Sequence, residues 1–146
     1  MTKIDGVKLT PLSMFEDERG AVLHFIKKSS SVFNEFGEVY FSKVNPGYEK
    51  GWKLHRKISQ RVVVPMGEVK FKIVDMRASS LTYGATDEFV IGQSNYAMCE
   101  IPAGVYYSFK SNIEEVSLIA NLIDSEHDPK ESIVLPLETE SFPDFS

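Results

Sequence analysis

The fold is decided by the stretch Gly47-Tyr48-Glu49-Lys50-Gly51-Trp52-Lys53-Leu54-His55-Arg56-Lys57-Ile58-Ser59-Gln60-Arg61-Val62-Val63-Val64-Pro65-Met66-Gly67. Its spacing is typical of paired strands in a small β-barrel that holds a metal through histidine and carboxylate side chains. The ligand positions would carry His, His and Glu, but here they carry Lys53, His55 and Gln60. Further along, Tyr107 stands where a fourth ligand, another histidine, belongs. The spacing therefore predicts the barrel, and the replaced residues argue against a metal.

The rest of the chain has the same β-rich pattern. Short apolar runs alternate with clusters of Gly, Pro, Asn and Asp, as expected for strands joined by tight turns. Val69, Phe71 and Ile73 alternate with lysines, which predicts a strand with one buried face. Only residues 29–36 indicate a helix, with serines at its start as caps. Further strands are expected at 6–10, 21–26, 38–44, 60–64, 87–91, 96–101 and 116–122.

Length and charge limit the class of protein. A chain of 146 residues is expected to form one domain, 1–146, with a core at about 5–136 and a tail at 137–146. The net charge of −5 argues against a general nucleic-acid or anionic-membrane partner, because both need a basic face. No run of about 18 apolar residues predicts a membrane span.

The single cysteine, Cys99, excludes an internal disulfide and fits a reducing cytoplasm, which is the expected location. Because Cys99 lies in a strand-like run, we expect a buried, unreactive thiol.

Several segments, at matching spacing over residues 5–136, resemble one family. The most specific are Val74-Asp75-Met76-Arg77-Ala78-Ser79-Ser80-Leu81-Thr82-Tyr83-Gly84 and Ile101-Pro102-Ala103-Gly104-Val105; the others are 17–20, 50–53 and 67–69. Together they resemble the dTDP-4-dehydrorhamnose 3,5-epimerases of the cupin superfamily. The resemblance implies an all-β cupin jelly-roll barrel with at most one or two short helices. It also implies a homodimer without metal or other cofactor. A nucleotide-linked sugar, a dTDP-sugar, is expected in the barrel mouth, on a bacterial polysaccharide (O-antigen or capsule) pathway.

The site departs from the pattern of that family. By the resemblance, the base histidine falls on Lys53, the acid tyrosine on Asn121, and a further histidine on Tyr107. A substrate-contacting lysine falls near Gln60. The family also carries an aspartate that orients the base, and no equivalent can be placed in this sequence.

Epimerisation beside a ketone needs a base, an acid and a group that stabilises the enolate oxygen. Lys53 is a candidate base only if it loses its proton; otherwise it is a charged contact to a diphosphate or carbonyl, or a solvated lysine. His55 points to the same side as Lys53 under strand alternation, and an ordinary histidine has a pKa of about 6.5, so His55 is the second candidate base. Tyr107 is a candidate acid from the opposite wall, as is Tyr106 if the register slips by one. The alternative for both tyrosines is wall packing.

Expected substrate contacts are Arg19, Gln60, Asn121, Lys43 and Trp52. By the resemblance, Arg19 would meet the diphosphate through its bidentate guanidinium, and the alternative is a surface arginine in a turn. Asn121 cannot usefully transfer a proton, but its amide can hold an oxygen or a water.

Two functional hypotheses follow. The first is an isomerase that moves a proton beside the ketone of a nucleotide-linked 4-keto-6-deoxy sugar without a metal. The second is a protein that keeps the sugar-nucleotide pocket and binds its ligand without turnover.

Overall fold

The computed structural model describes residues 2–142, so residues 143–146 of the expected tail lie outside the described part. The elements are β1 (Lys8–Pro11), β2 (Met14–Asp17), β3 (Gly20–Leu23), β4 (Glu38–Val44), β5 (Glu49–His55), β6 (Gln60–Met66), β7 (Glu68–Asp75), β8 (Thr86–Gly92), β9 (Ala97–Ile101), β10 (Val105–Ser111), β11 (Ser117–Ile123), the 3-10 helix η1 (Pro129–Glu131) and β12 (Ser132–Val134). No helix in this part of the chain is long and apolar enough to cross a membrane.

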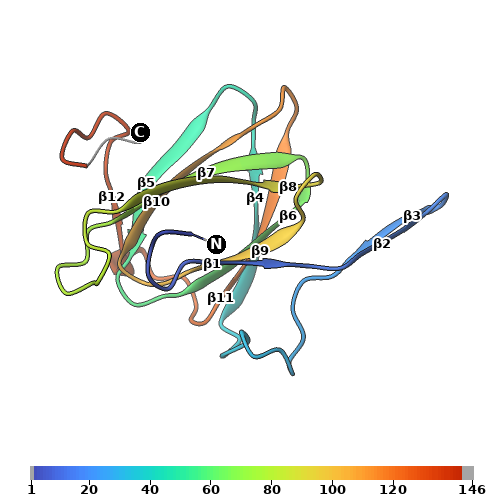
Figure 1. Cartoon of the computed structure of the whole chain (residues 1–146), viewed down its shortest axis with the longest axis horizontal. Coiled ribbons are helices and arrows are strands. Elements are labelled where there is room, and N and C mark those ends of the chain that lie inside the picture. Colours follow the sequence, from blue (N-terminus) through green and yellow to red (C-terminus); the bar gives the residue numbers. More distant parts are fainter. Residues whose placement is uncertain (1, 143–146) are drawn as a thin grey trace.

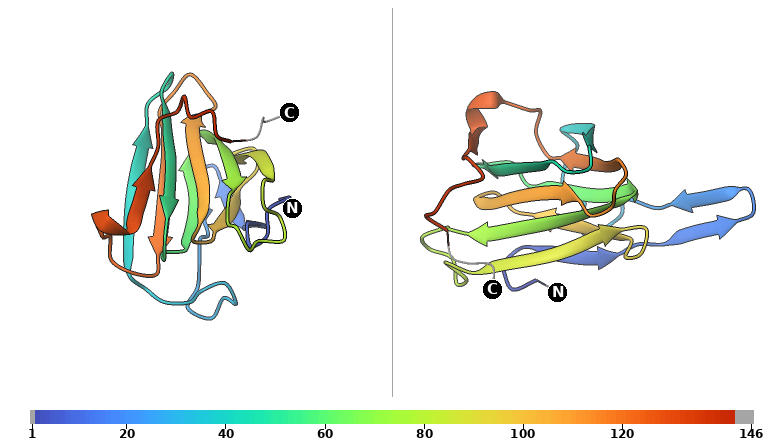
Figure 2. Two further views of the ribbon diagram at one scale, coloured as in Figure 1. Left: turned by 90° about the vertical axis from the view of Figure 1, so that its left-hand side faces the viewer. Right: turned by 90° about the horizontal axis from the view of Figure 1, so that it is seen from above.

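Two antiparallel sheets lie face to face (Figures 1 and 2). The first has the strand order β1-β9-β6-β11-β4, and the second has the order β12-β5-β10-β7-β8. Non-consecutive strands are neighbours in both sheets, as in a jelly roll, where closure of the two layers protects the apolar interior. The predicted all-β cupin jelly roll is therefore confirmed.

The core lies between the sheets. Val69, Phe71 and Ile73 of β7 point inward and are at most 1% exposed, as the alternation predicted. They pack against Val62 and Val64 of β6 on the other sheet. Each such side chain contributes about 1.5–3 kcal/mol relative to an exposed position. The buried thiol predicted for Cys99 is confirmed, since it belongs to the same core.

The prediction of a helix at residues 29–36 is wrong, because this segment forms turns instead. Ser30 N–H donates to the carbonyl of Lys27, and Phe33 N–H donates to the carbonyl of Ser30. The Ser30 hydroxyl also accepts from the amide of Lys27, a local bond that competes with helix formation. Val32 packs on the outer face of the first sheet, so tertiary contact outweighs the weak helical tendency of a short segment.

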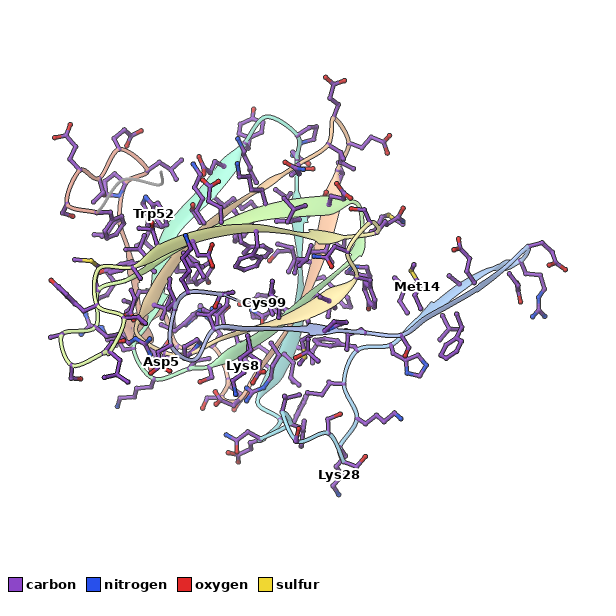
Figure 3. All side chains as sticks on the ribbon, viewed as in Figure 1. Asp5, Lys8, Met14, Lys28, Trp52 and Cys99 are labelled. Carbon is purple, nitrogen blue, oxygen red and sulfur yellow. The ribbon has the colours of Figure 1, made fainter. Side chains whose placement is uncertain are left out.

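The β2–β3 hairpin projects away from both sheets (Figures 1 and 2). Met14 marks its base in Figure 3. Phe15 and Val22 face each other across the hairpin and are 63% and 62% exposed. This projection leaves two large apolar side chains in water.

The segment after β12 returns along the second sheet. Phe142 packs edge-on against Trp52, with 4.9 Å between ring centroids, and lies 5.0 Å from the ring of Tyr106. Trp52 lies near this C-terminal segment in Figure 3. The contacts fix the outer face of β5 and β10, whose opposite faces line the interior.

Candidate active site

A cavity of about 230 Å³ lies between the two sheets at one end of the barrel. Its polar lining includes Tyr40, Ser42, Gln60 and Asn121 on the first sheet and Lys50, Lys53 and Tyr107 on the second. Apolar side chains complete the wall: Val62, Phe71, Ile101, Phe109 and Ile119. A largely apolar chamber with a few convergent polar groups is the usual form of a small-molecule site.

A buried acid–base pair lies behind this cavity. His55 at the end of β5 is 2% exposed, and its Nδ1 is 2.6 Å from Oε1 of Glu131. The backbone N–H groups of Lys57 and Ile58 donate to Oε2 of the same carboxylate, at 2.7 and 2.9 Å. These three contacts hold the carboxylate in one orientation.

The local chain explains how Glu131 reaches this place. Asp128 caps η1 by accepting from the amide of Lys130, and Pro129 starts the turn. The next residue after the turn, Ser132, pairs with His55 as β12 joins the edge of β5. The capped turn and the strand pairing together place Glu131 beside the imidazole.

The charges of the pair follow from its surroundings. Burial raises the pKa of Glu131, but donors from Lys57, His55 and Ile58 outweigh burial and hold the pKa below its usual value. Burial lowers the pKa of His55, and this effect outweighs the hydrogen bond that the ring donates to the ionised Glu131, which raises the pKa. At neutral pH the imidazole is therefore uncharged, with its proton on Nδ1 toward the carboxylate and a free lone pair on Nε2.

Tyr107 connects this pair to the cavity. Its hydroxyl lies 3.5 Å from Nε2 of His55 and 3.3 Å from Oε1 of Gln60. Burial raises the pKa of the Tyr107 phenol, so it stays protonated and acts as a donor. The order Glu131–His55–Tyr107 is that of an oriented base next to an activatable hydroxyl.

The polar chain continues onto the first sheet. Nδ2 of Asn121 donates to Oε1 of Gln60 at 2.7 Å and to the hydroxyl of Tyr40 at 3.1 Å. Oδ1 of Asn121 is buried and has no hydrogen-bond partner within residues 2–142. A buried amide oxygen of this kind normally has a donor, so the cavity offers an acceptor to a ligand.

Lys53 lies on the second sheet, in register with Tyr107. It lines the cavity and also an adjoining open hollow that contains Tyr40, Glu38 and His127. The positive charge of Lys53 also contributes to the lowered pKa of His55. Lys53 thus places an ammonium group at the cavity mouth.

The remaining expected residues lie elsewhere. Arg19 is on the projecting hairpin and pairs with Asp17 at 2.7 Å, outside the cavity of its own chain. Lys43 is exposed on β4 and is not in the cavity wall. Trp52 and Tyr106 pack against the C-terminal segment, outside that wall. Tyr107 is beside His55 on the adjacent strand, and not on the wall across from it.

Sequence reasoning missed two residues of this site, Glu131 and Tyr40. The capped turn Asp128-Pro129 was the available signal for an ordered carboxylate after it. For Tyr40 the signal was alternation along 38–44, which puts Tyr40 and Ser42 on one face. No group of three or more His, Cys, Asp or Glu that could hold a metal occurs in the described part of the chain.

The fold and the site define a cupin-type jelly roll with an acid–base group at the end of its barrel. The sequence model of the dTDP-4-dehydrorhamnose 3,5-epimerase family matches residues 1–142, and the chain belongs to this family. The members of the family are isomerases that act as sugar epimerases.

Two curated relatives are named for the biosynthesis of a polysaccharide or a glycan. The chain is 30% identical over 141 residues to the probable low-salt glycan biosynthesis epimerase Agl13 of Haloferax volcanii, covering 91% of this chain and 89% of the relative. It is 31% identical over 107 residues to the spore coat polysaccharide biosynthesis protein SpsL of Bacillus subtilis, covering 73% and 71%.

A solved structure of a dTDP sugar isomerase is similar to this chain in both fold and sequence. The dTDP sugar isomerase from Desulfovibrio desulfuricans G20 superimposes with a TM-score of 0.90 at 34% identity, covering 92% of this chain and 87% of that one. The likeness thus extends over nearly the whole jelly roll.

Proposed function

We propose that this protein is an active isomerase of a nucleotide-linked 4-keto-6-deoxy sugar, a dTDP-sugar, which moves a proton beside the ketone without a metal. The observation that carries this proposal is the Glu131–His55–Tyr107 sequence of contacts, which ends in a hydroxyl on the cavity wall. Family membership supports the substrate class. The names of the relatives support a place in polysaccharide synthesis, such as O-antigen or capsule.

The proposed chemistry starts at Tyr107. As its hydroxyl takes the acidic hydrogen from the carbon beside the ketone, its own proton passes to Nε2 of His55. The ionised Glu131 stabilises the imidazolium that forms. The electron pair of the broken C–H bond moves into the ketone, and the ammonium of Lys53 stabilises the enolate oxygen. Tyr107 is thus the group that takes the substrate hydrogen, His55 is the base that accepts the proton of Tyr107, and Lys53 acts by its charge.

We further propose that the protein works as a cytoplasmic homodimer joined through the β2–β3 hairpin. The exposed Phe15 and Val22 support this, because an isolated two-stranded hairpin is at best marginally stable in water. Arg19 on the same hairpin is then available to a diphosphate in the site of the partner, which suits its guanidinium.

The test is incubation with a panel of 4-keto-6-deoxy sugar nucleotides, beginning with dTDP-4-keto-6-deoxyglucose, in deuterium oxide. We expect deuterium beside the ketone and a new isomer, both visible by NMR. Binding of dTDP by folded protein, with no exchange into any of these sugars, would instead identify a binding protein without turnover.

A further inference from the structure

Tyr40 occupies the wall that faces Tyr107. It lies on β4 of the first sheet, while Tyr107 lies on β10 of the second, and both line the same cavity. The Tyr40 hydroxyl accepts a hydrogen bond from Nδ2 of Asn121 at 3.1 Å. Because the oxygen accepts this bond, its own proton remains available to another acceptor.

Asn121 fixes the direction of that hydroxyl. It is the cross-strand partner of Tyr40 on β11 and is 4% exposed. Its second donated bond, to Gln60 at 2.7 Å, prevents the amide from rotating freely. Gln60 in turn accepts from Tyr107 at 3.3 Å, so one polar chain links the two hydroxyls on opposite walls.

Tyr40 is in the protonated state that a proton donor needs. Burial raises the pKa of its phenol, against the lowering effect of the Asn121 contact, so the group is protonated at neutral pH. Tyr40 also lines the open hollow with Lys53 and His127. Water in that hollow can restore a proton lost by Tyr40 without passing through the closed part of the cavity.

We propose that Tyr40 is the catalytic acid, which gives a proton to the enolate from the wall opposite Tyr107, and that Asn121 is its positioning residue. This inference rests on the proposed function. In this step the Tyr40 O–H bond breaks, a new C–H bond forms from the enolate electron pair, and the ketone is restored. Water then reprotonates Tyr40, and after product release the proton held by His55 returns through Tyr107 to solvent.

The test separates removal of the first hydrogen from delivery of the second proton. In deuterium oxide, Tyr40→Phe still lets Tyr107 exchange the substrate hydrogen, but the deuteron returns from the original face. We expect exchange into recovered substrate within about threefold of wild type, and product formation reduced by roughly 10²-fold, the low end of a general acid's contribution. The matched control is Tyr48→Phe, because Tyr48 is 69% exposed and lies outside the cavity wall.

Asn121→Leu tests the positioning role separately. It keeps the side-chain size and removes both donated bonds, so we expect the ratio of product to exchange to fall about tenfold in a folded protein that still binds dTDP. A merely structural role would lower exchange and product together and leave their ratio unchanged.

Three results would decide against these roles. If the Tyr40→Phe variant forms product at the wild-type rate, Tyr40 is not the acid. The same holds if this variant still binds dTDP but loses exchange and product formation equally. An unchanged ratio in Asn121→Leu overturns the positioning role. Absence of exchange in the wild-type protein is a different result, because it contradicts the proposed function itself and this inference with it.

Discussion

The Glu131 carboxylate decides which nitrogen of His55 is free. Oε2 is already occupied by two backbone N–H donors, so only Oε1 faces the imidazole. An ionised oxygen there requires Nδ1 to carry the proton, and Nε2 is then the acceptor toward Tyr107. The proposed role of His55 as a base therefore depends on a residue that lies 76 positions away in the sequence.

Glu131→Gln should reverse this arrangement. The amide oxygen would turn toward the backbone N–H groups, leaving the amide N–H₂ toward His55 and forcing its proton onto Nε2. We expect deuterium exchange to fall by roughly 10²–10⁴-fold, the usual contribution of an acid–base group, with dTDP binding retained. Glu126→Gln, at an exposed position, is the control. Exchange at the wild-type rate in Glu131→Gln would show that the tautomer does not matter.

The fall in the rate of deuterium exchange at acidic pH should follow the protonation of His55. Burial lowers its pKa below the ordinary value of 6.5, so the neutral base persists to more acidic pH than a free histidine. Exchange should decline only as pH falls below 6.5 toward the folded pKa, and NMR titration of the imidazole should give the same midpoint. The stability that this group contributes, present above the unfolded pKa, should be lost over the same fall in pH. A midpoint above 6.5 would contradict this account.

Among single elements, the segment after β7 is held by a buried charge. Asp75 is fully buried and accepts from Arg77 Nε at 2.9 Å, from the Ser80 hydroxyl at 2.6 Å and from the Thr82 hydroxyl at 2.7 Å. Burial raises the pKa of Asp75, but these donors outweigh it and hold the pKa well below its usual range. This cluster fixes the loop that leads into β8.

Asp75→Asn should therefore destabilise the fold by about 2–4 kcal/mol, because it leaves Arg77 without its buried partner. The folded pKa of Asp75 is depressed, so its contribution is present above the unfolded pKa and is lost as pH falls below about 3.9. Urea unfolding at neutral and acidic pH measures both effects, and the difference between wild type and variant should shrink in acid. Glu114→Gln, which is exposed, should change the free energy of unfolding by less than about 0.5 kcal/mol. A stability equal to wild type at pH 7 would contradict the role of this cluster.

How far the sequence predicts an element depends on whether its contacts are local. Alternation along residues 69–74 predicted which face of β7 is buried, since strand geometry alone decides it. The helix predicted at 29–36 is absent, because Val32 is held by the outer face of a sheet formed from distant residues. Glu131 was missed for the same reason, as its partner is on another strand. The barrel spacing grouped Lys53, His55, Gln60 and Tyr107 at one end, and the family resemblance added Asn121 to them.

At the scale of the whole molecule, the projecting β2–β3 hairpin leads us to expect a dimer formed through it. If Phe15 and Val22 are covered by a second copy, Phe15→Asp should place a charge in that contact and give a monomer by light scattering at concentrations where wild type is dimeric. Leu81→Asp is the control, because Leu81 is 94% exposed on another loop. A monomeric wild-type protein, or a Phe15→Asp variant that remains dimeric, would refute the hairpin-mediated dimer.

The central claim is that the barrel removes a proton beside a ketone through Tyr107, with His55 and Glu131 behind it. The most direct measurement is the rate of deuterium incorporation into dTDP-4-keto-6-deoxyglucose, followed by NMR for the wild-type protein and Tyr107→Phe. We predict incorporation beside the ketone by the wild type, and a rate lower by roughly 10²–10⁴-fold in a folded Tyr107→Phe variant that still binds dTDP. No incorporation by the wild type, or an undiminished rate in the variant, would contradict the account.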